Sequence, residues 1–293
     1  MGFRIVKINN RSKLETQLNY LVCRNEKETR ILLDDISVLI IENQQVCITA
    51  ALMSELINHK VRVMFCDSKH NPQGELMPYS SCFDSSSKIR KQVCWEKEAA
   101  DILWKDIVRQ KITNQALVLK ERGYFESLGI LINYLNSIEL GDTTNREGLA
   151  AKSYFPAIFG TGFDRREDSD IRNTYLNYGY SLILGMVNRE ISISGYLTQL
   201  GIHHIGNTNP FNLGCDLMEP IRPLVDRMII KGDLKADTFK GTLLSIVSEQ
   251  VLIDGRVMIL ENAIRYYVLS FFQAMLTGQP KDLRHITFPD EQL

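Results

Sequence analysis

The 293-residue chain lacks several features that would restrict its class at once. Its 34 Lys and Arg are balanced by 35 Asp and Glu, and the net charge of −1 excludes a surface uniformly coated with positive charge for nucleic acid. No apolar run approaches the roughly 18 residues that a membrane span needs. Arg4 and Lys7 interrupt the N-terminal apolar segment, so no secretory signal is indicated. We therefore expect no membrane partner and a cytoplasmic location.

No C-x-x-C pair is present among the cysteines, which are Cys23, Cys47, Cys66, Cys82, Cys94 and Cys215. Several of them lie inside apolar, strand-like runs. This pattern predicts buried thiols in a reducing compartment instead of disulfides or a zinc site. A zinc hydrolase that uses His203 and His204 is disfavoured as well, because the sequence has no H-x-x-x-H spacing.

Proline is absent from two long stretches, one between Pro78 and Pro156 and one between Pro223 and Pro280. An interior proline costs a helix about 3 kcal/mol, so these stretches are free to be helical. Apolar residues recur at helical spacing in them, and we expect helix from residue 88 onward, including residues 243–276.

The first 70 residues have a different pattern, with short β-rich segments at 20–23, 30–33, 38–41, 46–48 and 61–65. Thr49 is a candidate N-cap for one helix near residues 50–57. Residues 68–87 contain Asn-Pro, Gly and a Ser-rich run and are expected to be a loop. The sequence thus predicts an α+β protein with a β-rich domain at 1–78, a linker at 79–88 and a helical domain at 89–293.

The highest concentration of candidate catalytic and metal-binding side chains lies in residues 200–226. They are His203, His204, Asp216, Glu219, Arg222 and Asp226. Asp216 and Glu219 are three residues apart and would share one face of a helix that begins at Asn212 or Asp216. Two carboxylates with a nearby imidazole are a plausible ligand set for a divalent cation.

Simpler roles remain open for several of these residues. Adjacent histidines point in different directions, so one of His203 and His204 would be a ligand and the other, favoured to be His203, a packing residue. Asp216 is equally suited to capping its helix. Arg222 is more consistent with an ion pair to Glu219 or Asp226 than with a contact to nucleic acid.

A second segment, residues 145–155, reads N-R-E-G-L-A-A-K-S-Y-F. Glu147 lies at or near a helix, and Ala150 and Ala151 would let a neighbouring helix approach closely. Arg146 and Lys152 flank the acid on either side.

Several ordered blocks carry a family resemblance. They are I-x-V-L-I-I-E-N, I-T-A-A-L and V-M-F-C-D near the N-terminus, then E-G-L-A-A-K-S-Y-F, L-N-Y-G-Y, G-I-H-H-I-G and D-L-M-E-P-I-R-P. Together they resemble the CRISPR-associated spacer integrases, and the type II branch most closely. The resemblance spans nearly the whole chain. It implies a small N-terminal β-sandwich-like domain with one short helix, suited to dimerisation, and a larger all-α catalytic domain.

The resemblance also implies a ligand set. Glu147, His204 and Glu219 would bind Mg²⁺ or Mn²⁺ as the catalytic centre, and Asp216 matches a further acidic position near the metal. Gly214-Cys215 departs from the small Ala-Ser type of pair expected before that aspartate, which changes little chemistry because neither residue is a proposed ligand.

The activity implied is metal-dependent transesterification, in which a 3′-hydroxyl of spacer DNA attacks a phosphodiester of the repeat array. Two alternatives remain open: an endonuclease that hydrolyses branched or single-stranded DNA with the same metal, and a non-catalytic DNA-binding scaffold. The implied partners are double-stranded DNA, a second copy of the chain and the small second CRISPR-associated integration subunit. The type II branch adds the RNA-guided effector and an accessory ring protein.

Candidate DNA contacts lie close to the proposed site in sequence. Arg146, Lys152, Arg165 and Arg166 would bind phosphates, and Tyr178 or Tyr154 would stack on an unpaired base, although helical spacing favours the core for both tyrosines. Residues 88–122 hold nine Lys and Arg against five Asp and Glu. This stretch is more simply the solvated face of amphipathic helices than a DNA track.

Overall fold

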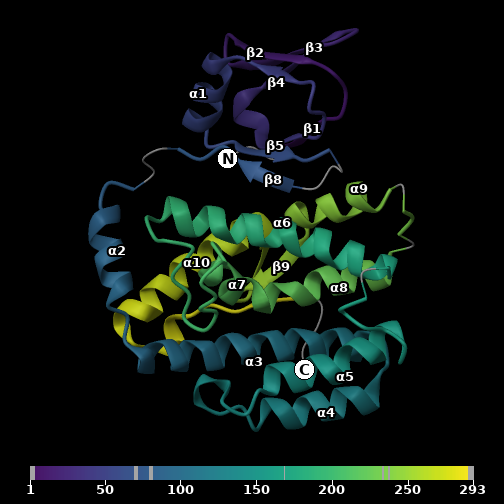
Figure 1. Ribbon diagram of the computed structural model, residues 1–293, viewed down its shortest axis with the longest axis vertical. Coiled ribbons are helices and arrows are strands. Elements are labelled where there is room, and N and C mark those ends of the chain that lie inside the picture. The colour runs from purple at the N-terminus through teal and green to yellow at the C-terminus, as the bar shows by residue number, and fades with distance from the viewer. Residues whose placement is uncertain are drawn as a thin grey trace. The chain divides into compact units, whose positions relative to one another are not determined.

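The computed structural model describes residues 4–68, 72–78, 82–167, 169–232, 234–236 and 238–289. The chain divides into two units, Met1–Ser80 and Ser81–Leu293, each with its own internal contacts. Strands dominate the first unit and helices the second (Figure 1), so the predicted α+β class is confirmed.

The N-terminal unit contains two four-stranded sheets. One has the order β1-β5-β7-β8, formed by Arg4–Ile8, Ile36–Ile41, Arg62–Cys66 and Pro72–Glu75, with β8 antiparallel to its parallel neighbours. The other has the order β4-β3-β2-β6, formed by Glu28–Leu32, Tyr20–Arg24, Lys13–Gln17 and Cys47–Ile48. Apolar side chains from both sheets and from helix α1 (Ala50–Asn58) share one buried core, which includes Val6, Ile8, Leu14, Leu21, Leu39, Leu52 and Leu56. The β-sandwich-like description with one short helix therefore holds.

Local signals located α1 correctly. The Thr49 hydroxyl accepts a hydrogen bond from the Leu52 amide at 3.3 Å and caps the helix, as the sequence predicts. The expected loop at 68–87 is wrong at two places. Strand β8 forms inside it, where buried Arg62 donates to Glu75 at 2.8 Å. Helix α2 (Ser85–Val93) begins within the predicted linker 79–88, and Lys88 pairs with Asp84 there at 3.0 Å.

The second unit is built mainly from helices. After α2 they are α3 (Lys97–Glu121), α4 (Phe125–Leu135), α5 (Arg146–Phe159), α6 (Ile171–Ile193), α7 (Asn212–Met218), α8 (Arg222–Lys231), α9 (Phe239–Leu244) and α10 (Leu260–Thr277). Helix α3 packs against α4, α5, α8 and α10. Its second half, residues 112–119, carries no charge and is almost completely buried, which places α3 in the interior of the unit.

Two glycines let helices approach closely around the proposed site. A side chain at Gly179 on α6 would collide with Val225 on α8, and one at Gly214 on α7 would collide with Asn188 on α6. Gly214, the departure from the family pattern, is thus explained by the close packing of α7 against α6.

The helical unit also contains a small sheet that the sequence analysis missed. Strands β9 (Gln250–Ile253), β10 (Arg256–Ile259) and β11 (Ile286–Thr287) pair in the order β10-β9-β11. The prediction of continuous helix over 243–276 is wrong here, and the domain is mostly helical instead of all-α. Asp254 and Gly255 adopt φ of 50° and 71°, the left-handed conformations of a two-residue hairpin turn.

Within the described ranges, none of the helices combines the length and the apolar composition that crossing a membrane requires.

We expect Gly179→Ala to destabilise the protein by about 1–3 kcal/mol, because its Cβ would push α6 away from Val225. Gly129→Ala on α4 is the matched control. No described atom outside its own stretch of helix lies within 4 Å of where its Cβ would stand, and losing a helix-interior glycine should stabilise the protein by about 0.5–1 kcal/mol. Urea unfolding of both variants measures the difference. Equal unfolding free energies would show that the α6–α8 contact can relax without cost.

Candidate active site

The start of α5 places Glu147. The Asp142 carboxylate accepts hydrogen bonds from the amides of Arg146 at 2.8 Å and Glu147 at 3.0 Å. Asn145, in a left-handed conformation with φ of 52°, accepts one from the Gly148 amide at 3.0 Å. A Cβ on Gly148 would lie 2.6 Å from the Asn145 oxygen, so any other residue there would make the Asn145 side chain shift. The N-R-E-G sequence therefore fixes Glu147 in the first helical turn.

Glu147 and Glu219 meet at one cation. Lys111, on α3, donates from Nζ to Glu147 Oε1 at 2.6 Å and to Glu219 Oε2 at 2.5 Å. Both Lys111 and Glu219 are buried, with 9% and 3% of their surface exposed. Arg222 Nε lies 2.9 Å from the other oxygen of Glu219, as one of the simpler readings of the sequence predicts. Two of the three proposed ligands thus converge on a shared positive charge.

The electrostatics keep Glu219 and Lys111 charged. Burial raises the pKa of Glu219, but Lys111 and Arg222 outweigh burial and hold that pKa below its ordinary value. Burial likewise lowers the pKa of Lys111, and the carboxylates of Glu219 and Glu147 reverse this and raise it. The interior therefore holds Glu219 as an ionised carboxylate between one lysine and one arginine.

The loop before α7 places His204. Asp216 is fully buried and accepts hydrogen bonds from the amides of Ile202 at 2.7 Å, His203 at 3.2 Å and His204 at 2.9 Å, and from His204 Nδ1 at 2.6 Å. These four bonds use the acceptor capacity of the carboxylate. Asp216 lies inside α7, which begins at Asn212, so it is not an N-cap. Asp216 instead fixes the backbone of residues 202–204 and the His204 imidazole.

Asp216 also affects the pKa and the tautomer of His204. The hydrogen bond from Nδ1 is the main reason that the pKa of His204 is raised, and the carboxylates of Glu219 and Glu147 add to it. In the neutral imidazole this bond places the proton on Nδ1 and leaves Nε2 as the acceptor or ligand atom. His203 stacks on the buried Trp104 ring at 4.0 Å between centroids, with 7° between the planes, so it packs as expected.

The donor set fits a divalent cation in chemistry, and in part in geometry. Glu147 and Glu219 already share one cation, and His204 has its Nε2 free of the Asp216 contact. Among the described residues, however, no three His, Cys, Asp or Glu side chains are close enough together to hold a metal ion as they stand. A metal would have to replace the Lys111 ammonium between the two glutamates.

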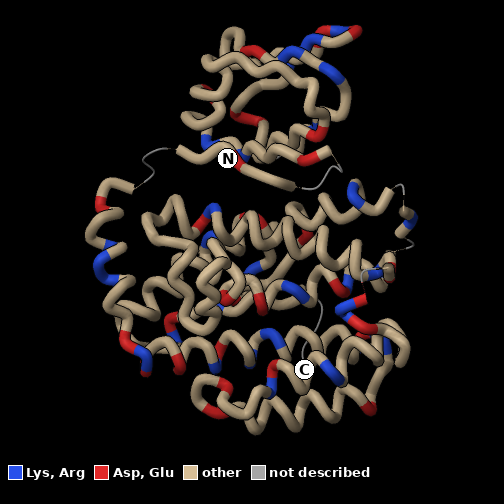
Figure 2. The backbone as a smooth tube through the Cα atoms, in the orientation of Figure 1, with Lys and Arg blue, Asp and Glu red and all other residues tan. Residues whose placement is uncertain are grey.

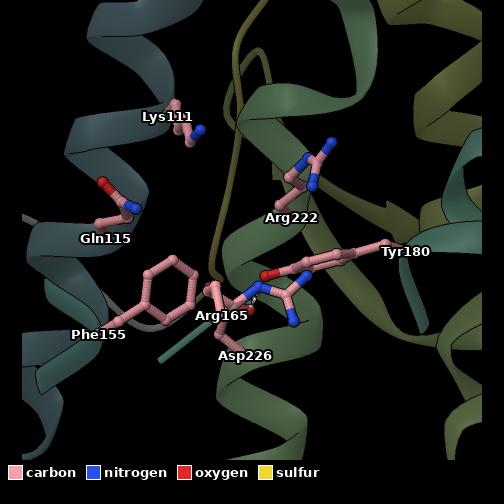
Figure 3. Close-up of a pocket in the computed structure, with 7 residues that line it drawn as sticks. All are labelled: Lys111, Gln115, Phe155, Arg165, Tyr180, Arg222 and Asp226. Atoms are coloured by element: carbon pink, nitrogen blue, oxygen red, sulfur yellow. Dashed lines mark hydrogen bonds between the residues drawn. The ribbon is translucent and has the colours of Figure 1, made fainter. Parts of the chain in front are cut away.

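A cavity of about 70 Å³ adjoins this site. Figure 3 shows its lining: Lys111, Gln115, Phe155, Arg165, Tyr180, Arg222 and Asp226. Asp226 on α8 is buried and accepts a hydrogen bond from the Tyr180 hydroxyl at 2.6 Å. Burial raises the pKa of Asp226 to about 6, although Tyr180, Lys111 and Arg222 oppose that rise.

A larger groove of about 850 Å³ lies beside His204. Trp95, Ile205, Asn207 and Asn209 are among the residues that line it. Gln92 supports one side, because its side-chain amide donates to the carbonyls of Leu197 and Leu200 at 2.8 and 3.1 Å. The groove gives a ligand of extended shape access to the imidazole.

Of the four basic residues predicted to contact DNA, two are exposed and two are half-buried. Lys152 is exposed, and Arg166 is 90% exposed beside Asp164. Arg165 instead donates to Asn173 at 2.5 Å and to Asn177 at 2.9 Å and lines the cavity. Arg146 is half-buried over the Tyr134 ring, 5.6 Å from its centroid.

Stacking of a base on Tyr178 is contradicted by its burial. The Tyr178 ring is only 5% exposed and contacts Phe239 at 5.6 Å between centroids. Tyr154 is fully buried as well. Both tyrosines are core residues, the alternative that their helical spacing favoured.

The basic stretch 88–122 does not form one positive surface. Figure 2 shows acidic segments interleaved with basic ones along α3. Its lysine at 111 is buried in the site, while Lys97 pairs with Asp101 at 3.0 Å on the surface. The arrangement is that of a solvated helix face with one lysine turned inward.

Sequence reasoning missed Lys111. The available signal was its position directly before the charge-free run 112–119, which predicts a fully buried helix. A lysine at the edge of such a run needs a buried partner. The partners, Glu147 and Glu219, are 36 and 108 residues away, so no local spacing indicates them.

Stability should depend on pH through Asp226. A carboxyl whose folded pKa, about 6, exceeds its unfolded value of 3.8 contributes stability that is fully present below pH 3.8 and is lost as pH rises through about 6. Asp226→Asn removes this titration. We expect the unfolding free energy of the wild type to fall relative to this variant by about 1–3 kcal/mol between pH 4.5 and 7.5.

Urea unfolding in EDTA at both pH values measures that difference. Asp254→Asn, at the exposed hairpin turn, is the control and should leave the pH profile unchanged. A difference between wild type and Asp226→Asn that stays constant with pH would contradict the raised pKa.

Comparison with known proteins agrees with this architecture. The family model of CRISPR associated protein Cas1 matches residues 6–247. A CRISPR-associated endonuclease Cas1 of Neisseria meningitidis serogroup C is 35% identical over 292 residues, covering 97% of this chain and 96% of the relative. The type II resemblance fits this relative.

Solved structures share the fold at lower identity. A casposase bound to its integration product has a TM-score of 0.75 at 19% identity and is covered to 94%, with 99% of this chain aligned. A chain of a Cas6-RT-Cas1–Cas2 complex has a TM-score of 0.72 at 18% identity, where this chain covers 36% of the longer one and is itself aligned over 99%. From the family match and the 35% identity over nearly its whole length, the chain belongs to the Cas1 family of CRISPR-associated endonucleases.

Proposed function

We propose that this Cas1 protein is a metal-dependent DNA integrase that joins 3′-hydroxyl ends of spacer DNA to a repeat array. The observation that carries the proposal is the meeting of Glu147 and Glu219 on one cation, next to an imidazole whose Nδ1 is held by Asp216. The likeness to a casposase bound to its integration product supports joining as the reaction type.

The proposed ligands are Glu147, Glu219 and Nε2 of His204. Hard oxygen donors with a single imidazole suit Mg²⁺ or Mn²⁺, and the imidazole favours Mn²⁺ somewhat. A bound divalent cation would stabilise negative charge at phosphorus and lower the pKa of the attacking hydroxyl. Asp216 orients the imidazole, and Arg222 supplies a second positive charge beside Glu219.

The reaction exchanges one phosphodiester for another. The oxygen of the spacer 3′-hydroxyl forms a new P–O bond, and the P–O bond to the 3′-oxygen of the repeat strand breaks. The proton that the attacking hydroxyl loses is balanced by the proton that the departing 3′-oxygen gains. No bond energy from ATP is needed, since the number of phosphodiesters is unchanged.

The partners follow from the same proposal. The groove beside His204 would receive a DNA strand, with Lys152 and Arg166 as exposed phosphate contacts. The solved Cas6-RT-Cas1–Cas2 complex supports the small second subunit, Cas2, as a partner. A second copy joined through the strand-rich N-terminal unit, and the type II effector with its accessory ring protein, complete the proposed cytoplasmic assembly.

A second candidate is hydrolysis of DNA at the same site. The Neisseria relative is named an endonuclease, and the same ligands would serve when water takes the place of the 3′-hydroxyl. The two activities differ in whether a donor strand becomes joined to the target.

Removal of any proposed ligand should abolish joining. We expect Glu147→Ala, His204→Ala and Glu219→Ala each to lower the joining rate at least about a hundredfold, because each removes charge stabilisation at the reacting phosphate. The assay mixes protein, Cas2, a labelled duplex with 3′-hydroxyl ends and a supercoiled plasmid that carries a repeat array, with Mn²⁺ or EDTA. Glu126→Ala, at an exposed position of α4, is the control and should retain activity.

The outcomes separate the candidates. Label on the plasmid with Mn²⁺ but not with EDTA supports the integrase. Plasmid cutting without label transfer would move the function to hydrolysis. Duplex binding that does not need metal, with no joining or cutting, would favour a scaffold and refute the ligand assignment.

We expect Lys152 to contribute to duplex binding only through its charge, by contact with a phosphate. Lys152→Ala should weaken duplex binding about equally for different sequences and reduce the salt dependence of the logarithm of the affinity by about one. Fluorescence anisotropy at several salt concentrations measures this slope. Lys60→Ala in the N-terminal unit is the comparison variant, and an unchanged slope in Lys152→Ala would exclude Lys152 as a phosphate contact.

A further inference from the structure

We propose that Lys111 is a resident counter-ion that a divalent cation displaces, and that the displaced ammonium moves into the adjoining cavity beside Gln115 and Asp226. Lys111 is then a positioning residue that sets how tightly the site binds metal. This inference rests on the proposed function, because it concerns the same two glutamates.

Lys111 and a divalent cation compete for the same atoms. The ammonium lies 2.6 Å from Glu147 Oε1 and 2.5 Å from Glu219 Oε2. A divalent ion bound to these oxygens at about 2.0–2.6 Å would occupy the same space. Two positive centres at such short range repel strongly in a buried site, so binding of one requires departure of the other.

The cavity offers the ammonium a destination. It is lined by Lys111 itself, and its volume of about 70 Å³ exceeds the roughly 30 Å³ that a water molecule takes up in the liquid. Lys111 and Gln115 both belong to α3 and both line the cavity (Figure 3). A change of side-chain rotamer, without movement of the helix, would carry Nζ toward the cavity.

Two buried acceptors in the cavity lining could receive the ammonium. Gln115 is 1% exposed, and its Oε1 accepts no hydrogen bond from the described residues. Asp226 is also 1% exposed and contributes a carboxylate to the lining. It accepts a hydrogen bond from the neutral hydroxyl of Tyr180 at 2.6 Å. An ammonium between Gln115 and Asp226 would satisfy the amide oxygen and bring a positive charge to the carboxylate.

The other cations of the lining are committed elsewhere. Arg165 donates to Asn173 and Asn177, and Arg222 pairs with Glu219 and lies over the Tyr180 ring at 4.7 Å. Arg222 remains with Glu219 when Lys111 leaves. Lys111 is therefore the mobile charge, and Asp226 affects metal binding by receiving it.

The test is a double-mutant cycle on the Mn²⁺ affinity of the full-length protein. The affinity is measured from the electron paramagnetic resonance signal of the Mn²⁺ that stays unbound. Lys111→Gln should bind Mn²⁺ at least about tenfold more tightly than wild type, because nothing must be displaced. Asp226→Asn should weaken binding about tenfold when Lys111 is present and have at least about a fivefold smaller effect in the Lys111→Gln background. Gln keeps hydrogen-bonding capacity at position 111, and a thermal melt in EDTA checks folding.

Lys231→Gln is the matched control. Lys231 on α8 forms an ion pair with Glu121, which lies ten residues, about 15 Å, along α3 from Lys111. Its removal should leave Mn²⁺ affinity unchanged. Lys111→Met, which fills the same volume without a polar end, repeats the measurement if Lys111→Gln does not fold.

The outcomes distinguish this inference from the proposed function. If wild type and Lys111→Gln bind Mn²⁺ equally, Lys111 is not displaced, and the metal centre stands without it. If Asp226→Asn weakens binding to the same extent in both backgrounds, Asp226 acts by its charge alone and does not receive Lys111. If no variant binds Mn²⁺, the metal centre itself is refuted.

Discussion

A buried carboxylate such as Glu219, which lies beside a second carboxylate, needs positive charge next to it, and much of the site follows from this requirement. Glu147 and Glu219 come from segments far apart in the sequence, and Lys111 on α3 joins them. Desolvation would otherwise favour a neutral form of one acid or drive the segments apart. The burial of α3 thus contributes to the site as well as to the packing, since it holds the backbone of Lys111 in place beside the two glutamates.

Local patterns predicted the fold well where one feature decides the structure. Thr49 caps α1, the β-rich segments of the first 70 residues form strands, and the second unit is mostly helical. The hairpin of β9 and β10 was missed because absence of proline permits helix without requiring it. The Asp254-Gly255 pair carried the opposing signal, a two-residue turn with positive φ.

The residues of the site differ in how far the sequence predicted them. His204, Asp216 and Glu219 are close in sequence, and spacing alone indicated a carboxylate and imidazole cluster. Glu147 emerged only through family resemblance, because a single glutamate near a helix start has many ordinary roles. For Lys111 the sequence held a signal for burial but none for its partners, since those contacts are created only by the tertiary fold. The burial of Tyr178 was indicated by its helical spacing, and the fold adds the contact with Phe239 from a distant helix.

The grip of Asp216 on residues 202–204 has an evolutionary consequence. Three of the four bonds to this carboxylate come from backbone amides, which every amino acid except proline possesses. The side chain of Ile202 can therefore change without loosening the loop, whereas proline at any of the three positions would remove one of these bonds. Asp216 has no such freedom, because glutamate is longer and asparagine replaces one acceptor with a donor. Selection should thus act on the Asp216 carboxylate and on His204, and tolerate variety at Ile202.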